Sequence, residues 1–168
     1  MKKIWARKAA VFEGVAISIG LWLFSCSNLY ACSCAPQPTP QEALRDADAV
    51  FRGTAIQVGD VDMKENAALL PMKKRIVLRV KTVWKGPHEK ELVVLTGAGG
   101  GDCGFGFVLG GEYLVYAHVG GMPSGYHTGL CTRTRDVAWL SDRQNAQEDF
   151  QALGPGTPIA TVESRRFP

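Results

Sequence analysis

Four cysteines, Cys32, Cys34, Cys103 and Cys131, constrain the fold more than any other feature of this sequence. A fifth, Cys26, lies in a segment that we expect to be removed. Four cysteines in a small exported domain are typical of two disulfides. A bond between Cys32 and Cys34 would close a strained ring, so each is expected to reach a distant partner. A four-cysteine zinc site is the alternative, although structural zinc sites usually space paired ligands by two to four residues.

Residues 1–31 have the pattern of a secretory signal peptide. The segment begins with four basic residues: Lys2, Lys3, Arg7 and Lys8. An apolar run over 14–24 follows, which is short for a membrane span and suits the core of a signal peptide. Cleavage after Ala31 would make Cys32 the first residue of the mature chain. The alternatives are an uncleaved membrane anchor and a lipoprotein with its lipid on Cys26 or Cys32.

The predicted leader accounts for the net charge of the chain. The whole chain has 19 basic and 16 acidic residues, and the leader holds four basic and one acidic, so fifteen of each remain. A neutral domain gives no reason to expect a nucleic acid or an anionic membrane as partner. Membrane contact is expected only if the chain is lipidated or keeps its leader. We expect a secreted or periplasmic protein, or one that is lipid-anchored to the cell envelope.

The residues after the first cysteines predict one helix, a series of short strands and a second helix. Thr39, Pro40 and Glu42 form a capping box with proline at the first helical position, so a helix is expected to run to about Ala47. Residues 60–72 are expected to form a polar loop. The predicted strands cover 49–59, 74–86, 92–97, 111–119 and 126–131, and the second helix covers 136–153. Gly53 and Gly59 indicate bends or a bulge in the first strand.

Aromatic and apolar residues indicate which faces of the strands are buried. In the strand over 74–86 one face is expected to carry Ile76, Leu78, Val80, Thr82 and Trp84. A large aromatic residue at the end of such a strand usually packs inside, so Trp84 is expected in the core. Tyr113 and Tyr116 lie three residues apart in one strand and therefore face opposite sides. At most one of them is expected deep in the core.

Strand number and chain length indicate a fold that is mainly β. Five short strands with a helix before and a helix after them match a five-stranded, OB-fold-like closed barrel with flanking short helices and two disulfides. Closure removes exposed strand edges. We expect a signal peptide over 1–31, the barrel domain over 32–153 and a loose C-terminal tail over 154–168.

The other motifs do not predict an enzyme. The glycine-rich stretch over 99–104 fits a dinucleotide-binding pattern, but no helix is predicted after it, so we interpret it as a loop that carries Cys103. His88, His118 and His127 show no metal-ligand spacing in the sequence and are expected to have structural roles. No nucleophile elbow or paired-carboxylate arrangement stands out. We expect no catalytic residue, no cofactor and no small-molecule substrate.

Several stretches in order along the chain resemble the tissue inhibitors of metalloproteinases and the wider netrin-like domain family. The most specific is "CSCAP" at the predicted mature N-terminus, residues 32–36. It is followed by "DAVFRGTA", "VLRVKTVWKG", "DCGFGFVLGGEYLVYA" and "GLCTRTR". The resemblance covers Cys32 to about Asp142. A third disulfide of animal members is missing, with Leu44 at the matching helix position, and no cysteine-rich second domain follows. We therefore expect a bacterial-type member with a single domain.

The resemblance implies a disulfide pairing and a binding edge. The disulfides would be Cys32–Cys103 and Cys34–Cys131. In the family, the amine and carbonyl of the first cysteine bind the zinc of a target protease, which assigns Cys32 to that role. Ser33 would enter the specificity pocket of the protease. The rest of the protease-binding edge would be Cys34, Ala35, Pro36, Gly101 and Asp102.

The resulting hypothesis is a secreted or periplasmic inhibitor of a zinc metalloprotease. In an extended segment Cys32 and Cys34 point the same way and Ser33 points away from them. Two disulfides would fix this segment before it binds and so reduce the ordering cost of binding. The alternatives are a netrin-like module that binds a protein without inhibiting it, and a lipid-anchored protein of the cell envelope.

Overall fold

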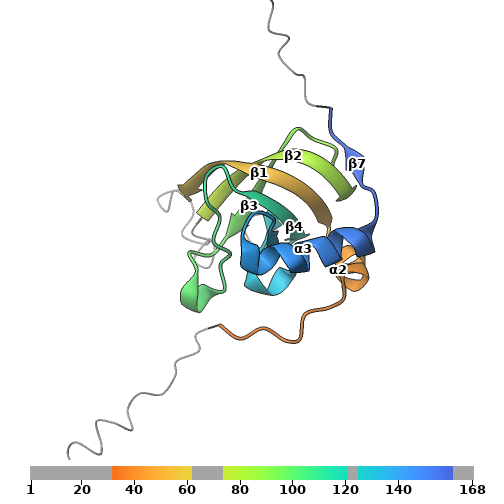
Figure 1. The fold of residues 1–168 in the computed structure, drawn as a ribbon. Coiled ribbons are helices and arrows are strands. Elements are labelled where there is room, and N and C mark those ends of the chain that lie inside the picture. Colours follow the sequence, from red (N-terminus) through yellow and green to blue (C-terminus); the bar gives the residue numbers. More distant parts are fainter. Residues whose placement is uncertain (1–31, 62–73, 121–124, 161–168) are drawn as a thin grey trace, which may run out of the picture. The chain divides into compact units, whose positions relative to one another are not determined.

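The computed structural model describes residues 32–61, 74–120 and 125–160 (Figure 1). The predicted signal peptide and nearly all of the predicted polar loop lie outside these residues. The described helices are α2 (Pro40–Asp46) and α3 (Leu140–Leu153), with short 3-10 turns η2 (Gly100–Asp102) and η3 (Leu130–Thr132). The described strands are β1 (Ala49–Asp60), β2 (Lys74–Lys85), β3 (Glu91–Thr96), β4 (Glu112–Val119), β5 (Tyr126–His127), β6 (Arg135–Asp136) and β7 (Thr157–Pro158).

Five strands close into the predicted barrel. β1 pairs with β2, β2 with β3, β3 with β5, β5 with β4, and β4 returns to β1. The pairing of β3 with β5 is parallel, and the others are antiparallel. The order β1-β2-β3-β5-β4 is that of an OB-type barrel. The two-residue strand β6 adds to β4, and β7 adds to β2.

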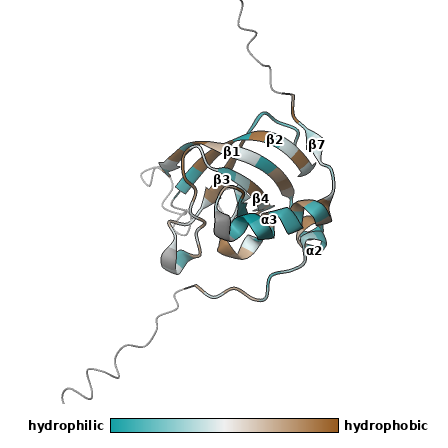
Figure 2. Ribbon diagram, in the orientation of Figure 1, coloured by the Kyte–Doolittle hydropathy of each residue, from teal (hydrophilic) through white to brown (hydrophobic). Residues whose placement is uncertain are grey.

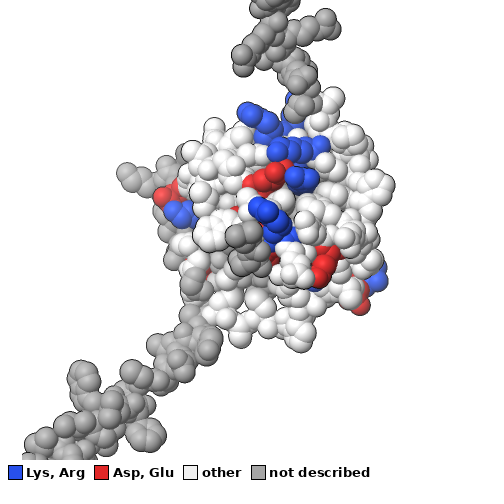
Figure 3. Space-filling view, in the orientation of Figure 1, with Lys and Arg blue, Asp and Glu red and all other residues white. Residues whose placement is uncertain are grey.

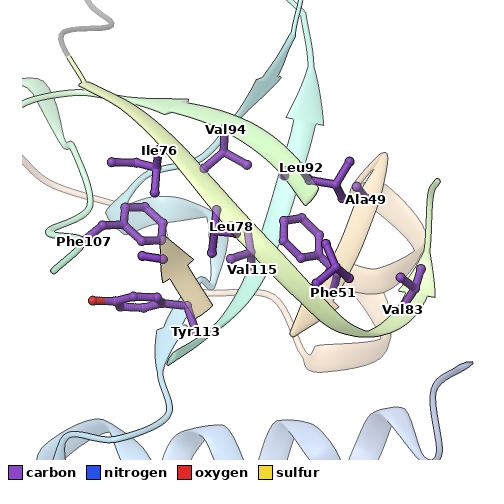
Figure 4. Close-up of a cluster of buried hydrophobic side chains, with 13 residues drawn as sticks. Ala49, Phe51, Ile76, Leu78, Val83, Leu92, Val94, Phe107, Tyr113 and Val115 are labelled. Atoms are coloured by element: carbon purple, nitrogen blue, oxygen red, sulfur yellow. The ribbon is translucent and has the colours of Figure 1, made fainter. Parts of the chain in front are cut away.

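The barrel interior is filled by side chains from alternate positions of its strands. Figure 4 shows these side chains pointing toward one another from β1, β2, β3 and β4 and from the segment that contains Phe107. Phe107 and Tyr113 meet edge to face, with their ring centroids 4.6 Å apart. The buried cluster comprises Ala49, Phe51, Ala55, Ile76, Leu78, Val80, Val83, Leu92, Val94, Phe107, Tyr113, Val115 and Ala117.

The predicted face of β2 is correct in its first half and wrong in its second. Ile76, Leu78 and Val80 are buried in the barrel, but Val83 replaces Thr82 and Trp84 as the inward residue beyond them. The cause is an extra residue at Lys81, because Arg52 of β1 pairs with Thr82 while the next residue, Gly53, pairs with Val80. A bulge shifts the alternation by one residue and moves every later side chain to the opposite face.

A second buried cluster lies outside the barrel wall, under the two helices. α2 and α3 contact each other on one side of the barrel (Figure 1). Trp84 belongs to this outer cluster and not to the barrel core. Its ring stacks on Phe150 of α3 at 5.7 Å, and its indole N–H donates to the carbonyl of Gly154 at 2.8 Å. Leu44 of α2 packs there as well.

The two tyrosines of β4 face opposite sides, as predicted, yet both are fully buried. Tyr113 points into the barrel, and Tyr116 points into the cluster under the helices. The expectation that only one would be deep is wrong, because the helices cover the outer face of β4 at this point.

Helix α2 begins where polar side chains satisfy its first amides, whereas α3 begins after Trp139 without a side-chain cap. The predicted capping box is present: Thr39 N donates to Glu42 Oε2 at 2.9 Å, and Glu42 N donates to Thr39 Oγ1 at 3.3 Å. α3 begins at Leu140, later than predicted, because residues 135–136 pair with β4 as β6. Figure 2 shows α3 as mostly hydrophilic, which fits a helix with one covered face. Beyond α3, Ile159 N donates to Lys81 O at 2.9 Å, so the chain follows β2 this far.

Candidate functional site: the N-terminal edge

Two disulfides hold the start of the described chain against the barrel. Cys32 is bonded to Cys103 and Cys34 to Cys131, each with a Cα–Cα distance of 5.3 Å. This is the pairing that the family resemblance implied. The four-cysteine zinc alternative is wrong, because all four sulfurs are used in the disulfides. The sulfurs of Cys32, Cys34 and Cys131 lie within 4.8 Å of one another, so the two disulfides are side by side.

The segment between and after the two pinned cysteines is open to solvent. Ser33, Cys34, Ala35 and Pro36 are exposed, while Cys32 is half-buried. This segment pairs with no strand, so its position depends mainly on the two disulfides. Figure 1 shows it as an extended stretch that leads into α2.

The glycine-rich loop beside Cys32 is organised by one carboxylate. Asp102 accepts hydrogen bonds from the backbone amides of Ala98 at 2.8 Å, Gly99 at 2.9 Å and Gly104 at 3.1 Å. Gly101, which the resemblance also placed at the edge, is exposed. The Asp102 carboxylate is thus engaged within its own loop. It shapes the position of Gly101 and of Cys103.

Close backbone packing within the loop depends on glycine. A Cβ on Gly104 would lie 2.2 Å from the carbonyl carbon of Gly97, which no side chain tolerates. Cys103 itself has a positive φ of 54°, a conformation that residues other than glycine adopt infrequently. The close packing accounts for glycine at positions 97 and 104.

A third segment, residues 128–132, completes the edge. Leu130 N donates to Cys103 O at 2.9 Å, so a backbone hydrogen bond links the loop that carries Cys103 to the turn that carries Cys131. Thr128 Oγ1 lies 2.6 Å from Thr134 Oγ1 and donates to Tyr116 O at 3.0 Å. Leu130 keeps 43% of its surface exposed. The edge therefore has three parts: the N-terminal segment, the glycine-rich loop and the turn at Leu130.

An arginine that the sequence did not single out holds the far end of the N-terminal segment. Arg133 Nη1 donates to Pro38 O at 2.6 Å. Its other nitrogens bind the carboxylate of Asp149 on α3, which is fully buried. Arg135 Nη2 donates to Gln37 Oε1 at 2.5 Å. The sequence pattern did not indicate a role for Arg133 or Arg135, because each contacts a residue that is 95 or more positions away in the chain.

The fold and the site together define a class: a small OB-type, netrin-like barrel that presents its own N-terminal segment on two disulfides. Among the described residues no helix is long and apolar enough to cross a membrane.

Comparison with known proteins identifies the family. Metalloproteinase inhibitor 2 of Canis lupus familiaris is 34% identical over 105 residues, which are 60% of this chain and 46% of the relative. The Cavia porcellus protein of the same name is 33% identical over 128 residues, 73% of this chain and 57% of the relative. The Homo sapiens protein is 33% identical over 105 residues, 60% of this chain and 46% of the relative. No protein-family model matches the chain. The chain belongs to the family of tissue inhibitors of metalloproteinases and netrin-like domains. It spans about half the length of these curated relatives.

Proposed function

We propose that the domain beginning at Cys32 inhibits a zinc metalloprotease through its N-terminal edge. The observation that carries the proposal is the pairing of Cys32 with Cys103 and Cys34 with Cys131, which holds an exposed N-terminal segment in a fixed place. The names of the relatives, metalloproteinase inhibitors, support the choice of partner. The domain would act as an inhibitor and not as an enzyme.

The chemistry proposed for Cys32 follows from the coordination of catalytic zinc. Such an ion has three protein ligands and one position for water. The α-amine and the carbonyl oxygen of one residue form a five-membered ring with a metal and can displace that water. The amine must be neutral to bind, and the reference pKa of an α-amine is about 7.7–8.0. Binding would therefore release a proton and weaken in acid.

The rest of the edge would determine which protease is bound. Ser33 would enter the specificity pocket, and Cys34, Ala35 and Pro36 would lie along the substrate cleft. Gly101 would add a neighbouring contact, and Asp102 would act by holding that loop in place, since its carboxylate accepts three backbone amides.

The proposal requires a free amine at Cys32, and hence cleavage after Ala31. It also places the protein outside the cytoplasm, secreted or periplasmic, because disulfides persist in oxidising compartments. Mass spectrometry of the mature N-terminus tests this step. A free Cys32 supports it, whereas a lipid on Cys26 or Cys32 would support the envelope-anchored alternative.

One added residue tests zinc chelation directly. Two forms of the disulfide-bonded domain would be compared against a panel of zinc metalloproteases, one starting at Cys32 and one with an alanine before it. The extension turns the amine into an amide, a poor zinc ligand, and lies outside both disulfide loops. We expect inhibition to fall by orders of magnitude while the melting temperature stays the same. If the extended form binds and inhibits equally well, chelation is wrong. If the native form binds a protease without inhibiting it, the domain is a binding module.

A further inference from the structure

Two of the three histidines, which are nine residues apart in the sequence, lie directly opposite each other in the barrel. His118 on β4 is the antiparallel partner of His127 on β5. The third, His88, lies in the turn between β2 and β3 and pairs with neither. The sequence gives no sign of the pair, because it depends on how β4 and β5 are aligned.

Both imidazoles point away from the barrel core on the same face. Directly opposed residues of an antiparallel pair project to one side of a sheet, with Cβ atoms about 4.5–5.5 Å apart. Ala117 and Tyr126, the neighbours of the two histidines, pack on the barrel core. His118 and His127 therefore face outward, and each is partly exposed to solvent. Rings mounted at this spacing can turn their nitrogens toward one point.

We propose that His118 and His127 form a binding site for a divalent transition-metal ion of the Cu²⁺, Ni²⁺ and Zn²⁺ class. Neutral imidazole nitrogens are ligands for these ions and bind at about 2.0–2.1 Å in zinc sites. Cross-strand pairing fixes both backbones, so little conformational freedom is lost when the second ring binds. Asp48 adds a nearby negative charge, since its carboxylate accepts from the amide of Val119, the residue after His118, at 2.6 Å.

The pair supplies two protein ligands. Among the described residues, the three cysteines Cys32, Cys34 and Cys131 are the one group of three potential ligands that converges, and their sulfurs are used in disulfides. The remaining coordination positions are therefore filled by water or by a group from a second molecule. This inference does not depend on the proposed inhibition, because the ion bound here would be separate from the zinc of a protease.

The test is a titration of the disulfide-bonded domain that begins at Cys32 with CuCl₂ and with ZnCl₂, in the absence of any protease. The variants are His118→Gln and His127→Gln, and His88→Gln is the matched control because it removes an exposed imidazole elsewhere. All forms share the same N-terminus, so any metal held by the Cys32 amine is common to them. Calorimetry gives the affinity, and the histidine ring signals in NMR spectra identify the residues that respond.

We expect one ion per domain at the pair, bound more tightly for Cu²⁺ than for Zn²⁺, with no response to Mg²⁺. Each of the two variants should weaken this binding on the order of 10- to 100-fold, which is the size of effect seen even for the outer partners of metal ligands. His88→Gln should bind as the native domain does. The proposal is overturned if the ring signals of His118 and His127 respond no more than those of His88, or if either variant retains native affinity.

Discussion

Arg133 and Asp149 form a buried ion pair in which the guanidinium donates hydrogen bonds to both carboxylate oxygens. Arg133 Nε donates to Asp149 Oδ1 and Oδ2, each at 3.0 Å, and Nη2 donates to Oδ1 at 2.6 Å. The Asp149 side chain is fully buried, and that of Arg133 is 12% exposed. The remaining Nη1 donates to Pro38 O. One side chain thus connects helix α3 to the end of the N-terminal segment that carries the proposed inhibitory edge.

Removal of Arg133 alone should destabilise the fold more than removal of the whole pair. Arg133→Met removes the main partner of the buried Asp149 carboxylate and leaves it only Arg135 Nε, which lies 4.0 Å from Oδ2, as a charged partner among the described residues. Breaking a buried pair in this way costs about 3–5 kcal/mol. In the native domain the hydroxyl of Tyr116 donates to Asp149 Oδ2 at 3.4 Å. Arg133→Met with Asp149→Asn removes the charge of Asp149 and keeps an acceptor for this hydroxyl. Urea unfolding of the single and double variants measures the difference. Equal losses in the two would show that the buried charge is not the cause.

The same double variant should loosen the N-terminal segment even where stability is recovered. Without Arg133 the carbonyl of Pro38 loses its hydrogen bond, so the amides near Gln37 and Thr39 should exchange faster with deuterium. The core strands β2 and β3 serve as the internal control, because their exchange should follow global stability alone. Unchanged exchange in the segment would mean that the disulfides hold it without help.

Gly104→Ala should disrupt the loop that presents Cys103, and Gly106→Ala should not. The new Cβ at position 104 would meet the backbone of Gly97 at 2.2 Å, whereas nothing lies within 4 Å of one at position 106. Overpacking of this kind costs about 1–3 kcal/mol. Denaturant unfolding measures the cost, and non-reducing peptide mapping reports whether Cys32–Cys103 still forms. Similar behaviour of the two variants would contradict the close packing of Gly97 on Gly104.

Glu112 should make part of the stability depend on pH. Burial opposes ionisation of Glu112, but hydrogen bonds and charge from Arg52 and Lys81, each at 2.8 Å, outweigh burial and lower the pKa of Glu112. Figure 3 shows one face of the domain, on which acidic side chains lie among basic ones. A lowered folded pKa means that the contribution is complete above the ordinary value of 4.5 and is lost as the pH falls through the lowered pKa.

Glu112→Gln should therefore be less stable than the native domain at neutral pH, and the gap should close in acid. Unfolding free energies measured from pH 7 down to pH 2 test this expectation. Glu148→Gln, which changes an exposed residue of α3, is the matched control and should show a gap of about zero throughout. A gap for Glu112→Gln that stays constant with pH would exclude the ion pairs as its source.

The parts of the fold set by local patterns could be predicted from the sequence, and the parts set by register could not. Thr39 and Glu42 cap α2 through contacts within one turn, so their residue types were sufficient. The bulge at Lys81 depends on how β1 aligns with β2, and it displaced Thr82 and Trp84 from the predicted face. The disulfide pairing was available through the family resemblance.

The site shows the same division. The exposed cysteine-containing segment was recognisable because its residues are contiguous. Arg133 and the pair His118–His127 were not, since their partners become neighbours only when the barrel closes and α3 packs on it. Asp102 was placed at the edge from its position beside Cys103, but the carboxylate turns into its own loop.

Substitution of Ser33 should change which proteases are inhibited without changing the fold. Ser33 is exposed between two disulfide-bonded cysteines, so a larger side chain there meets solvent in the free domain. In the proposed complex the same side chain enters the specificity pocket, where size and charge discriminate between targets. Ser33→Arg should therefore weaken inhibition of proteases with small or apolar pockets far more than of those with deep or acidic ones.

His88→Arg is the matched control. It places the same side chain in the turn between β2 and β3, away from the glycine-rich loop that follows β3, and should leave all inhibition constants unchanged. Inhibition constants for both variants against a panel of zinc metalloproteases provide the measurement. If Ser33→Arg changes every constant by the same factor, Ser33 does not occupy the specificity pocket.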